Sequence, residues 1–129
     1  MKPSTTIRRR VEWMDTDAAG IWHYSTVIRL AEAAEADLHG RLGIKQVTFG
    51  ATPRAHIEFD FESPLEFDDE VDVTLSVAAL GTSSITYDVA VAGPAGPVAT
   101  GRIVTVFIDG ETKRPAPLPD DVRRALEGT

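Results

Sequence analysis

Five segments of the chain are rich in strand-forming residues, and all but the last, residues 98–108, alternate between apolar and polar residues, which is the period of strands with one buried face. In residues 5–13 the alternation places Ile7, Val11 and Trp13 on one face, with Arg9 as the charged member of that row. The other four segments are residues 57–62, 71–77, 85–91 and 98–108. Turn-forming residues cluster between the later segments, so we expect short connections and antiparallel neighbours.

One long segment, residues 25–40, has instead the three- and four-residue spacing of an amphipathic helix. Its apolar stripe consists of Val27, Leu30, Ala31, Ala34 and Leu38. Ser25 or Thr26 is expected to cap the first turn of this helix. Gly40 or Gly43 is expected to supply the left-handed residue that ends it.

The order of elements is one strand, a long helix and then four strands. A single helix cannot shield so many strands unless the sheet curls around it. We therefore predict an α+β fold, in which a five-stranded antiparallel sheet wraps around one central helix. Asp120 and Asp121 are expected to open a short terminal helix. No repeat or low-complexity linker divides the 129 residues, which predicts a single domain over residues 1–129.

Composition removes several function classes. The formal net charge is −7, which argues against nucleic acid as a partner because phosphate neutralisation dominates that binding. The chain has no Cys, which excludes disulfides, thiolate nucleophiles and cysteine-bound metals. It has no long apolar run and no apolar signal segment, so we expect a cytoplasmic protein that does not bind membranes. Residues 58–72 hold eight acids and no base; they lack the spacing of a calcium loop and are typical of a solvated strand and turn.

Residue types that carry chemistry are densest in residues 13–26, between the first strand and the long helix. A helix start offers free backbone N–H groups and the positive end of the helix dipole, which can polarise a carbonyl oxygen. Asp17 beside them can act as a nucleophile or as a general base on water. The alternative is that Asp15, Thr16 and Asp17 only cap turns. The candidate N–H groups are those of His23, Tyr24 and Ser25.

Residues 11–24 have the sequence Val-Glu-Trp-Met-Asp-Thr-Asp-Ala-Ala-Gly-Ile-Trp-His-Tyr and precede a helix that contains Glu32. This pattern resembles the hotdog-fold thioesterases. The branch it is most similar to is the 4-hydroxybenzoyl-CoA thioesterase-like group, which includes the short acyl-CoA thioesterase of the Tol-Pal operon. Further matches lie in residues 57–59, 64–71 and 106–109 and in the Pro-rich tail. The resemblance covers nearly the whole chain, and the hotdog fold agrees with the predicted architecture.

The resemblance implies that a thioester is hydrolysed to a free acid and a thiol, with coenzyme A as part of the substrate and no further cofactor. It assigns the catalytic carboxylate to Asp17, as nucleophile or general base, and the carbonyl-polarising N–H to Tyr24. Asp15 and Glu32 are expected to support the site without reacting. The residues expected to contact the substrate are Gly20, Trp22, His23, Thr52 and Pro53.

Two departures from the family pattern leave alternatives open. The Tol-Pal branch has a Tyr-His pair where this chain has His23 and Tyr24. The turn 81–84 lacks the base that related enzymes often set against the phosphates of coenzyme A. The cations available for those phosphates are Arg8, Arg10, Arg54, Arg102, Lys113 and Arg114. An acyl-carrier-protein thioesterase and a non-catalytic acyl-thioester binding protein are therefore alternatives; a hotdog dehydratase fits less well, because the Asp-Thr-Asp-x-x-Gly loop is not its pattern.

The resemblance also implies assembly. Hotdog subunits pair edge to edge, so we expect a homodimer or homotetramer in which Asp17 faces residues 49–56 of the other subunit. His39 lies near the end of the long helix, where we expect a contact with the helix dipole. His23, His39 and His56 do not have the spacing of a metal site, and none is predicted.

Overall fold

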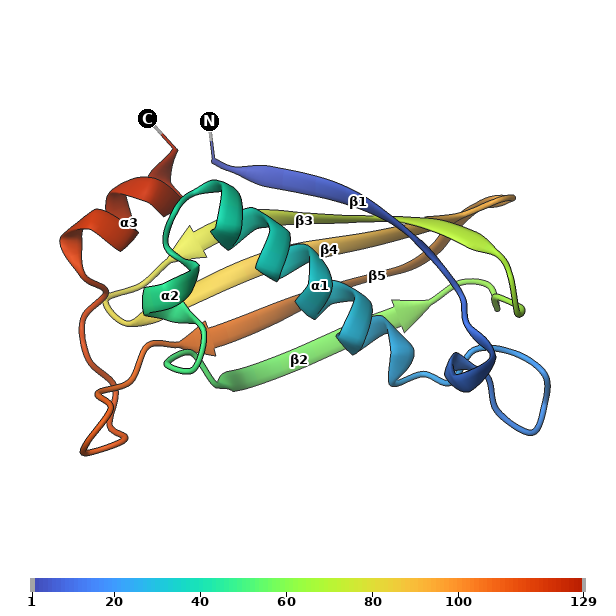
Figure 1. The fold of residues 1–129 in the computed structure, drawn as a ribbon, viewed down its shortest axis with the longest axis horizontal. Coiled ribbons are helices and arrows are strands. Elements are labelled where there is room, and N and C mark those ends of the chain that lie inside the picture. The colour runs from blue at the N-terminus through green and yellow to red at the C-terminus, as the bar shows by residue number, and fades with distance from the viewer. Residues whose placement is uncertain (1, 129) are drawn as a thin grey trace.

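The computed structural model describes residues 2–128 (Figure 1). The strands are β1 (Ser4–Arg10), β2 (Arg54–Phe61), β3 (Glu70–Leu80), β4 (Ser84–Gly93) and β5 (Gly96–Val106). The helices are α1 (Thr26–Arg41), α2 (Lys45–Thr48) and α3 (Asp120–Glu127), and a 3-10 turn, η1, spans Trp13–Asp15. All strand pairs are antiparallel, in the order β1-β3-β4-β5-β2. The edges of the sheet are therefore β1 and β2.

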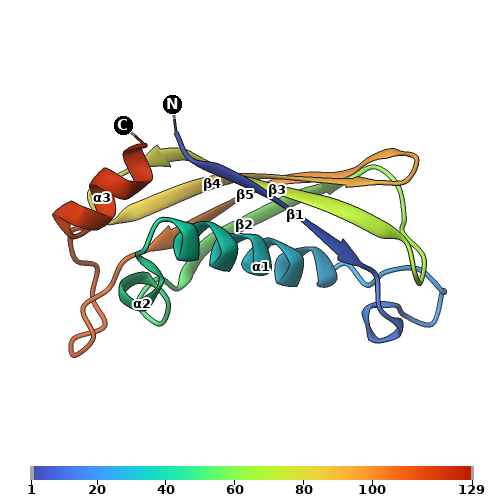
Figure 2. The same ribbon diagram turned by 45° about the horizontal axis from the view of Figure 1, so that its top comes forward.

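The sheet curves around α1, which lies along its concave face (Figures 1 and 2). The predicted apolar stripe of α1 is buried in full, and the helix packs mainly against β1 and β3. Apolar side chains of β3, β4 and β5 fill the rest of the core. The predicted hotdog architecture is confirmed, because only a curled sheet brings these strands within reach of one helix. The short helix that begins at Asp120 is confirmed as well.

The first strand is shorter than the alternation predicts. β1 ends before Val11, whose N–H still bonds across to the carbonyl oxygen of Asp69. The chain then turns into η1, because the N–H of Asp15 bonds to the oxygen of Glu12 and the N–H of Glu12 bonds to the Asp15 carboxylate. Trp13 leaves the sheet and is 74% exposed, so its predicted place on the inner face is wrong.

The start of α1 differs from the prediction, whereas its end agrees with it. Neither hydroxyl caps the start: Ser25 Oγ lies 2.7 Å from Nδ1 of His23, and Thr26 Oγ1 donates to the carbonyl oxygen of Asp15. The predicted cap is wrong because the preceding loop offers both hydroxyls nearer partners. At the other end Gly43 has a φ of +74°, which confirms the left-handed stop.

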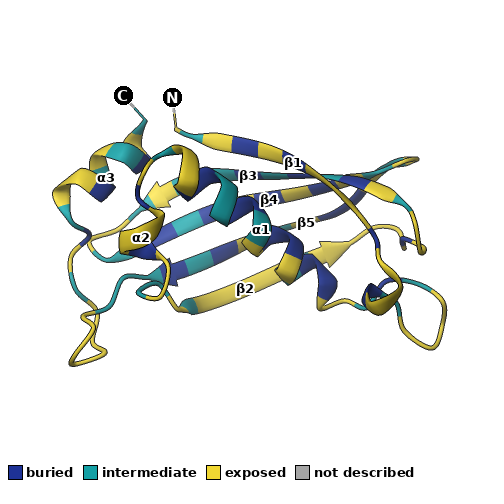
Figure 3. Ribbon diagram, in the orientation of Figure 1, coloured by how far each residue is buried: buried dark blue, intermediate teal, exposed yellow. Residues whose placement is uncertain are grey.

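The edge strand β2 is exposed along most of both faces (Figure 3). Its alternation predicted one buried face, but Ile57 and Phe61 are 38% and 47% exposed. The reason is that α1 packs mainly against β1 and β3, at the opposite edge of the sheet, and leaves most of β2 uncovered. Among residues 2–128, no second strand pairs with the outer edge of β2.

Candidate active site

The segment between η1 and α1 lies at the end of α1 far from α2 (Figure 1), and Asp17 is in a small hairpin of this segment. The N–H of Asp17 bonds to the oxygen of Ile21 at 2.9 Å, and the N–H of Gly20 bonds back to the oxygen of Asp17. Gly20 has a φ of +81°, a conformation that suits glycine, so its predicted role in a tight turn fits this geometry. Within residues 2–128 the Asp17 carboxylate accepts one hydrogen bond, from the N–H of Ala19 at 2.9 Å, and the residue is exposed.

The hairpin is tied to the segment before β3 through main-chain contacts. The N–H of Trp22 bonds to the carbonyl oxygen of Leu65 at 2.8 Å, and Ile21 forms a bridge with Glu66. The Trp22 ring is 5% exposed and Leu65 is 2% exposed, so this tie is buried. The loop that carries Asp17 is therefore fixed to a segment more than forty residues away.

A cleft of about 390 Å³ opens between these two segments. Asp17 lies on one side of it, and the end of β2 forms the other. The rings of Trp22 and Phe61 meet edge to face, with centroids 5.9 Å apart. The residues that line the cleft are Asp17, Ile21, Trp22, Tyr24, Phe61, Glu62, Ser63 and Pro64. Most of the wall is thus apolar or aromatic, and the two charged groups are both carboxylates.

The start of α1 presents one free N–H beside this cleft. The N–H of His23 bonds to the oxygen of Asp15, and the N–H of Ser25 bonds to Nδ1 of His23. Within residues 2–128, no protein group accepts a hydrogen bond from the N–H of Tyr24. Of the three N–H groups that the sequence offered, the geometry leaves only that of Tyr24 open to a ligand.

The aromatic pair at the helix start is stacked. The rings of His23 and Tyr24 lie 4.2 Å apart at 32°, and the ring of Tyr24 is 69% exposed. Tyr24 lines the cleft, but His23 does not, since its ring turns back toward Ser25. His23 therefore does not join the cleft that contains Asp17.

Asp15 is held away from the cleft. Its side chain is 3% exposed, accepts the N–H of Glu12 at 2.8 Å and pairs with Arg29 of α1. Its carbonyl oxygen accepts the hydroxyl of Thr26. These contacts fasten the loop to the first turns of α1, which fits the expected supporting position of Asp15.

Three other predicted residues lie in a separate, smaller cleft of about 190 Å³. It is lined by Glu32, Glu35, Phe49, Gly50, Thr52, Pro53 and Arg54. The Thr52 hydroxyl donates to the carbonyl oxygen of Thr48 at 2.9 Å. Within one chain, Glu32, Thr52 and Pro53 are therefore not brought together with Asp17. His56, on β2, lies outside this cleft and contacts Glu58 at the surface.

Beneath that smaller cleft lies a buried polar cluster, which we define as Glu35, His39, Thr48, Arg54 and Tyr87. Arg54 pairs with Glu35 at 2.7 Å, and Glu35 is 3% exposed. His39 shares hydrogen bonds with the Thr48 hydroxyl (2.5 Å) and the Tyr87 hydroxyl (2.7 Å). Burial, and then the charge of Arg54, lower the pKa of His39 to about 4, and burial raises the pKa of Tyr87. The expected dipole contact of His39 is wrong, because its ring points into the core.

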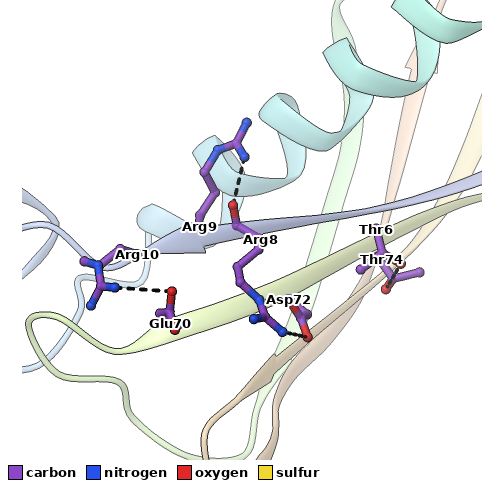
Figure 4. A network of polar contacts seen from close by, with 7 residues as sticks. All are labelled: Thr6, Arg8, Arg9, Arg10, Glu70, Asp72 and Thr74. Carbon is purple, nitrogen blue, oxygen red and sulfur yellow. Dashed lines mark hydrogen bonds and ion pairs between the residues drawn. The ribbon is translucent and has the colours of Figure 1, made fainter.

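The cations are mostly engaged. Arg8 pairs with Asp72, and Arg10 with Glu70, on the strands β1 and β3 (Figure 4). Arg102 pairs with Asp88 on the outer face of the sheet. The turn 81–84 has no base of its own, but Arg123 of α3 donates to the carbonyl oxygens of Gly81 and Thr82. That guanidinium was not anticipated from the sequence, because it reaches the turn from forty residues away.

Two further searches of residues 2–128 concern metals and membranes. No three His, Asp or Glu side chains in this range are gathered as a metal ion requires. None of its helices combines the length and the apolar composition needed to cross a membrane.

Comparison with known proteins decides the family. A family model described as the thioesterase-like superfamily matches residues 11–126. The chain belongs to this superfamily. A 1,4-dihydroxy-2-naphthoyl-CoA hydrolase of Nostoc punctiforme is 31% identical over 133 residues, covering 96% of this chain and 87% of its own length.

Solved structures agree. A thioesterase of Thermus thermophilus, complexed with coenzyme A and zinc, has a TM-score of 0.85 at 28% identity, over 94% of this chain and 90% of its own. A 4-hydroxybenzoyl-CoA thioesterase, solved with 4-hydroxybenzoyl-CoA, has a TM-score of 0.83 at 23% identity, over 95% and 98%; this last likeness concerns the fold. The resemblance to hotdog-fold thioesterases is thereby confirmed in family, in fold and in enzyme class.

Proposed function

We propose that this thioesterase hydrolyses acyl-CoA with Asp17 as its catalytic carboxylate and the N–H of Tyr24 as the donor to the thioester carbonyl. One observation carries the proposal. Asp17, whose side chain is exposed, and Tyr24, whose N–H has no acceptor within residues 2–128, line the same largely apolar cleft at the start of α1. A carbonyl carbon placed between them would meet a nucleophile or base on one side and a polarising donor on its oxygen.

The reaction follows from these two groups. As the carbonyl carbon is attacked, negative charge grows on its oxygen, where the Tyr24 N–H and the positive end of α1 stabilise it. In one route the Asp17 carboxylate attacks, the C–S bond breaks, the thiolate takes a proton, and water then hydrolyses the mixed anhydride. In the other route Asp17 takes a proton from water as the water oxygen bonds to the carbonyl carbon; the C–S bond then breaks, and the leaving thiolate takes that proton back.

An aromatic acyl group is the substrate class that the cleft favours. Trp22, Tyr24 and Phe61 present three rings to the space beside Asp17. Flat acyl groups gain contact area against such walls. The Nostoc punctiforme relative is named for a naphthoyl-CoA, which is an aromatic thioester. We therefore propose a hydroxylated or unsubstituted aroyl-CoA as the preferred substrate.

The second part of the proposal is a homodimer that pairs through β2. The outer edge of β2 has free main-chain groups and carries the exposed side chains of Ile57 and Phe61. Antiparallel pairing of β2 with a second copy would set the Phe61 end of each strand beside the Arg54 end of the other. Thr52 and Pro53 of one copy would then approach the Asp17 cleft of the other.

The assembly has its own test. We expect light scattering after size exclusion to give at least a dimer for the wild type, and Ile57→Lys to shift it toward the monomer. Activity should fall with dissociation, because each cleft would lose one wall. A wild type that is monomeric at assay concentration would contradict the dimer and leave the Asp17 assignment to its own experiment.

The assay that tests the chemistry measures thiol release from acetyl-, butyryl-, palmitoyl- and benzoyl-CoA. Asp17→Asn keeps an oxygen for the Ala19 N–H, and it should lower kcat/KM by roughly a thousandfold or more. The matched control is Asp109→Asn, whose side chain accepts the N–H groups of Glu111 and Thr112 in another turn. The control should keep activity within about threefold, as surface substitutions usually do.

Each outcome is informative. Single turnover in ¹⁸O-water identifies the nucleophilic route if the label enters Asp17, because only hydrolysis of a mixed anhydride at its aspartyl carbon transfers the label into the protein. Hydrolysis of acyl carrier protein thioesters but not of acyl-CoA would move the substrate to the carrier protein. Binding of acyl-CoA without turnover, unaffected by Asp17→Asn, would contradict the catalytic proposal in favour of a binding protein.

A further inference from the structure

The cleft beside Asp17 holds a second carboxylate that the proposed reaction does not use. Glu62, an exposed residue, lines this cleft together with Asp17, and no Lys or Arg is among the lining residues. Neither Asp17 nor Glu62 forms an ion pair with another residue of the range 2–128. An acyl group bound in this cleft would therefore lie near two carboxylates, with no Lys or Arg among the lining residues.

The backbone around Glu62 is fixed. Its N–H bonds to the carbonyl oxygen of Val98 at 2.8 Å, and the Ser63 hydroxyl donates to the oxygen of Pro97. Leu65, three residues on, is buried and accepts the N–H of Trp22 from the Asp17 hairpin. The two carboxylates thus sit on two segments joined by hydrogen bonds, and Glu62 cannot leave the cleft by a shift of its loop alone.

Cations at this end of the molecule are committed elsewhere. Arg29 pairs with the buried Asp15, and Arg8 and Arg10 pair with acids of β3 (Figure 4). Arg9 turns toward α1 and donates to a main-chain oxygen. Arg54, at the strand end that the proposed dimer would bring alongside, is held by Glu35. None of these cations therefore forms an ion pair with Glu62.

We propose that Glu62 makes the cleft select against acyl groups that carry a carboxylate of their own. This inference rests on the proposed function, since it concerns the acyl site of that reaction. Succinyl-CoA and butyryl-CoA have acyl chains of the same length, and they differ in that a carboxylate replaces a methyl group. Glu62 repels the succinyl carboxylate when both lie at the same cleft, and because Glu62 is exposed this repulsion is partly screened by water and salt. The same repulsion aids departure of the carboxylate product.

The test compares kcat/KM for succinyl-CoA with kcat/KM for butyryl-CoA. Glu62→Gln should raise this ratio about five- to tenfold, and Glu62→Lys should raise it further, because a charge of opposite sign attracts the acyl carboxylate. The effect should shrink in 0.5 M salt. The control is Glu66→Gln, which removes the same charge from an exposed residue of the same loop that does not line the cleft.

A binding measurement separates this inference from the proposed reaction. In an Asp17→Asn background, titration calorimetry gives the Kd of both acyl-CoAs without consuming them. The ratio of the two constants should move by a similar factor when Glu62 becomes Gln. An unchanged ratio, or an equal change in Glu66→Gln, would overturn the selectivity role, whatever the wild-type activity. If the binding ratio shifted but the wild-type protein showed no turnover, the selectivity role of Glu62 would stand and the catalytic proposal would be rejected.

Discussion

The two ends of α1 hold polar side chains in opposite ways. At its start the Asp17 hairpin is held through main-chain hydrogen bonds, while the N–H of Tyr24 is free and both Asp17 and Tyr24 line an open cleft. Near its end, Glu35 and His39 are buried, and their side chains are bonded to Arg54, Thr48 and Tyr87. At the start of α1 the hydrogen bonds are made by the main chain, and the side chains remain available to a ligand. Near the end of α1 the side chains themselves are bonded to other residues.

This contrast separates chemistry from stability. A group that reacts with substrate must keep its lone pairs or its N–H free, so it contributes little to the folded state. A buried charge or imidazole must be paired, because leaving it unpaired costs more than the bond returns. We therefore expect substitutions at the start of α1 to change turnover and those in the buried polar cluster to change the free energy of unfolding.

The largest effect should come from the buried ion pair. Glu35→Ala leaves Arg54 without its buried partner and should lower the free energy of unfolding by roughly 3–4 kcal/mol. The control is Glu32→Ala, one turn earlier, whose exposed carboxylate lies 3.7 Å from the same guanidinium; it should cost less than about 0.5 kcal/mol. Urea denaturation measures both. Equal losses of unfolding free energy in Glu35→Ala and Glu32→Ala would contradict the distinction between a buried and an exposed partner. Asp17→Asn should leave the urea midpoint unchanged.

The second effect is a dependence on pH. His39 has a pKa of about 4 in the folded protein against an ordinary value of 6.5, so the unfolded chain binds more protons between these values. The free energy of unfolding should fall as the pH drops from about 6.5 to 4, by roughly 2–3 kcal/mol from this group. His39→Phe should flatten that part of the profile. Parallel profiles for the two proteins between these pH values would contradict the assignment.

A single hydroxyl gives a smaller and cleaner comparison. Tyr87→Phe leaves a ring nitrogen of His39 unpaired in the core and should cost about 1–2 kcal/mol. Tyr24→Phe removes the same hydroxyl from an exposed ring at the other end of α1, and its Tm should not move. If the two variants had the same Tm, the buried hydrogen bond between Tyr87 and His39 would make no net contribution to stability.

The smallest effect is expected on the sheet surface. Arg8 and Asp72 are exposed, although their contact lowers the pKa of Asp72 (Figure 4). Arg8→Gln should leave the Tm within about 1 °C, because solvent and salt screen such pairs. Thermal melts at low and at 0.5 M salt would check this, and a clear loss at low salt would count against it.

The sequence supports the fold well wherever one face of an element is buried. The spacing of the α1 stripe and the alternation in β3 and β4 follow directly from burial, so periodicity predicts them. Alternation failed at Trp13 and Ile57 for a common reason. It does not reveal where the sheet ends or which strand the helix leaves uncovered.

The site was predictable in part. The Asp-Thr-Asp-x-x-Gly pattern indicated Asp17 and Tyr24, and the structure places both at one cleft. The opposite wall, residues 61–64, was missed, because its approach depends on a contact between Trp22 and Leu65 that local pattern does not encode. Exposed apolar Phe61 at a strand end, followed by Pro64, was the one available signal. The bond from His39 to Tyr87 spans 48 residues and was equally invisible.

The tie between the Asp17 hairpin and the wall of the cleft uses main-chain atoms of Trp22 and Leu65, and Glu62 is held through its own N–H. Side chains at Ile21, Phe61 and Glu62 can therefore be exchanged while Asp17 and Tyr24 keep their places. A protein built in this way can acquire a new acyl preference through a few substitutions. The Asp17 hairpin would not have to be rebuilt, which makes these three positions the natural targets for redesign.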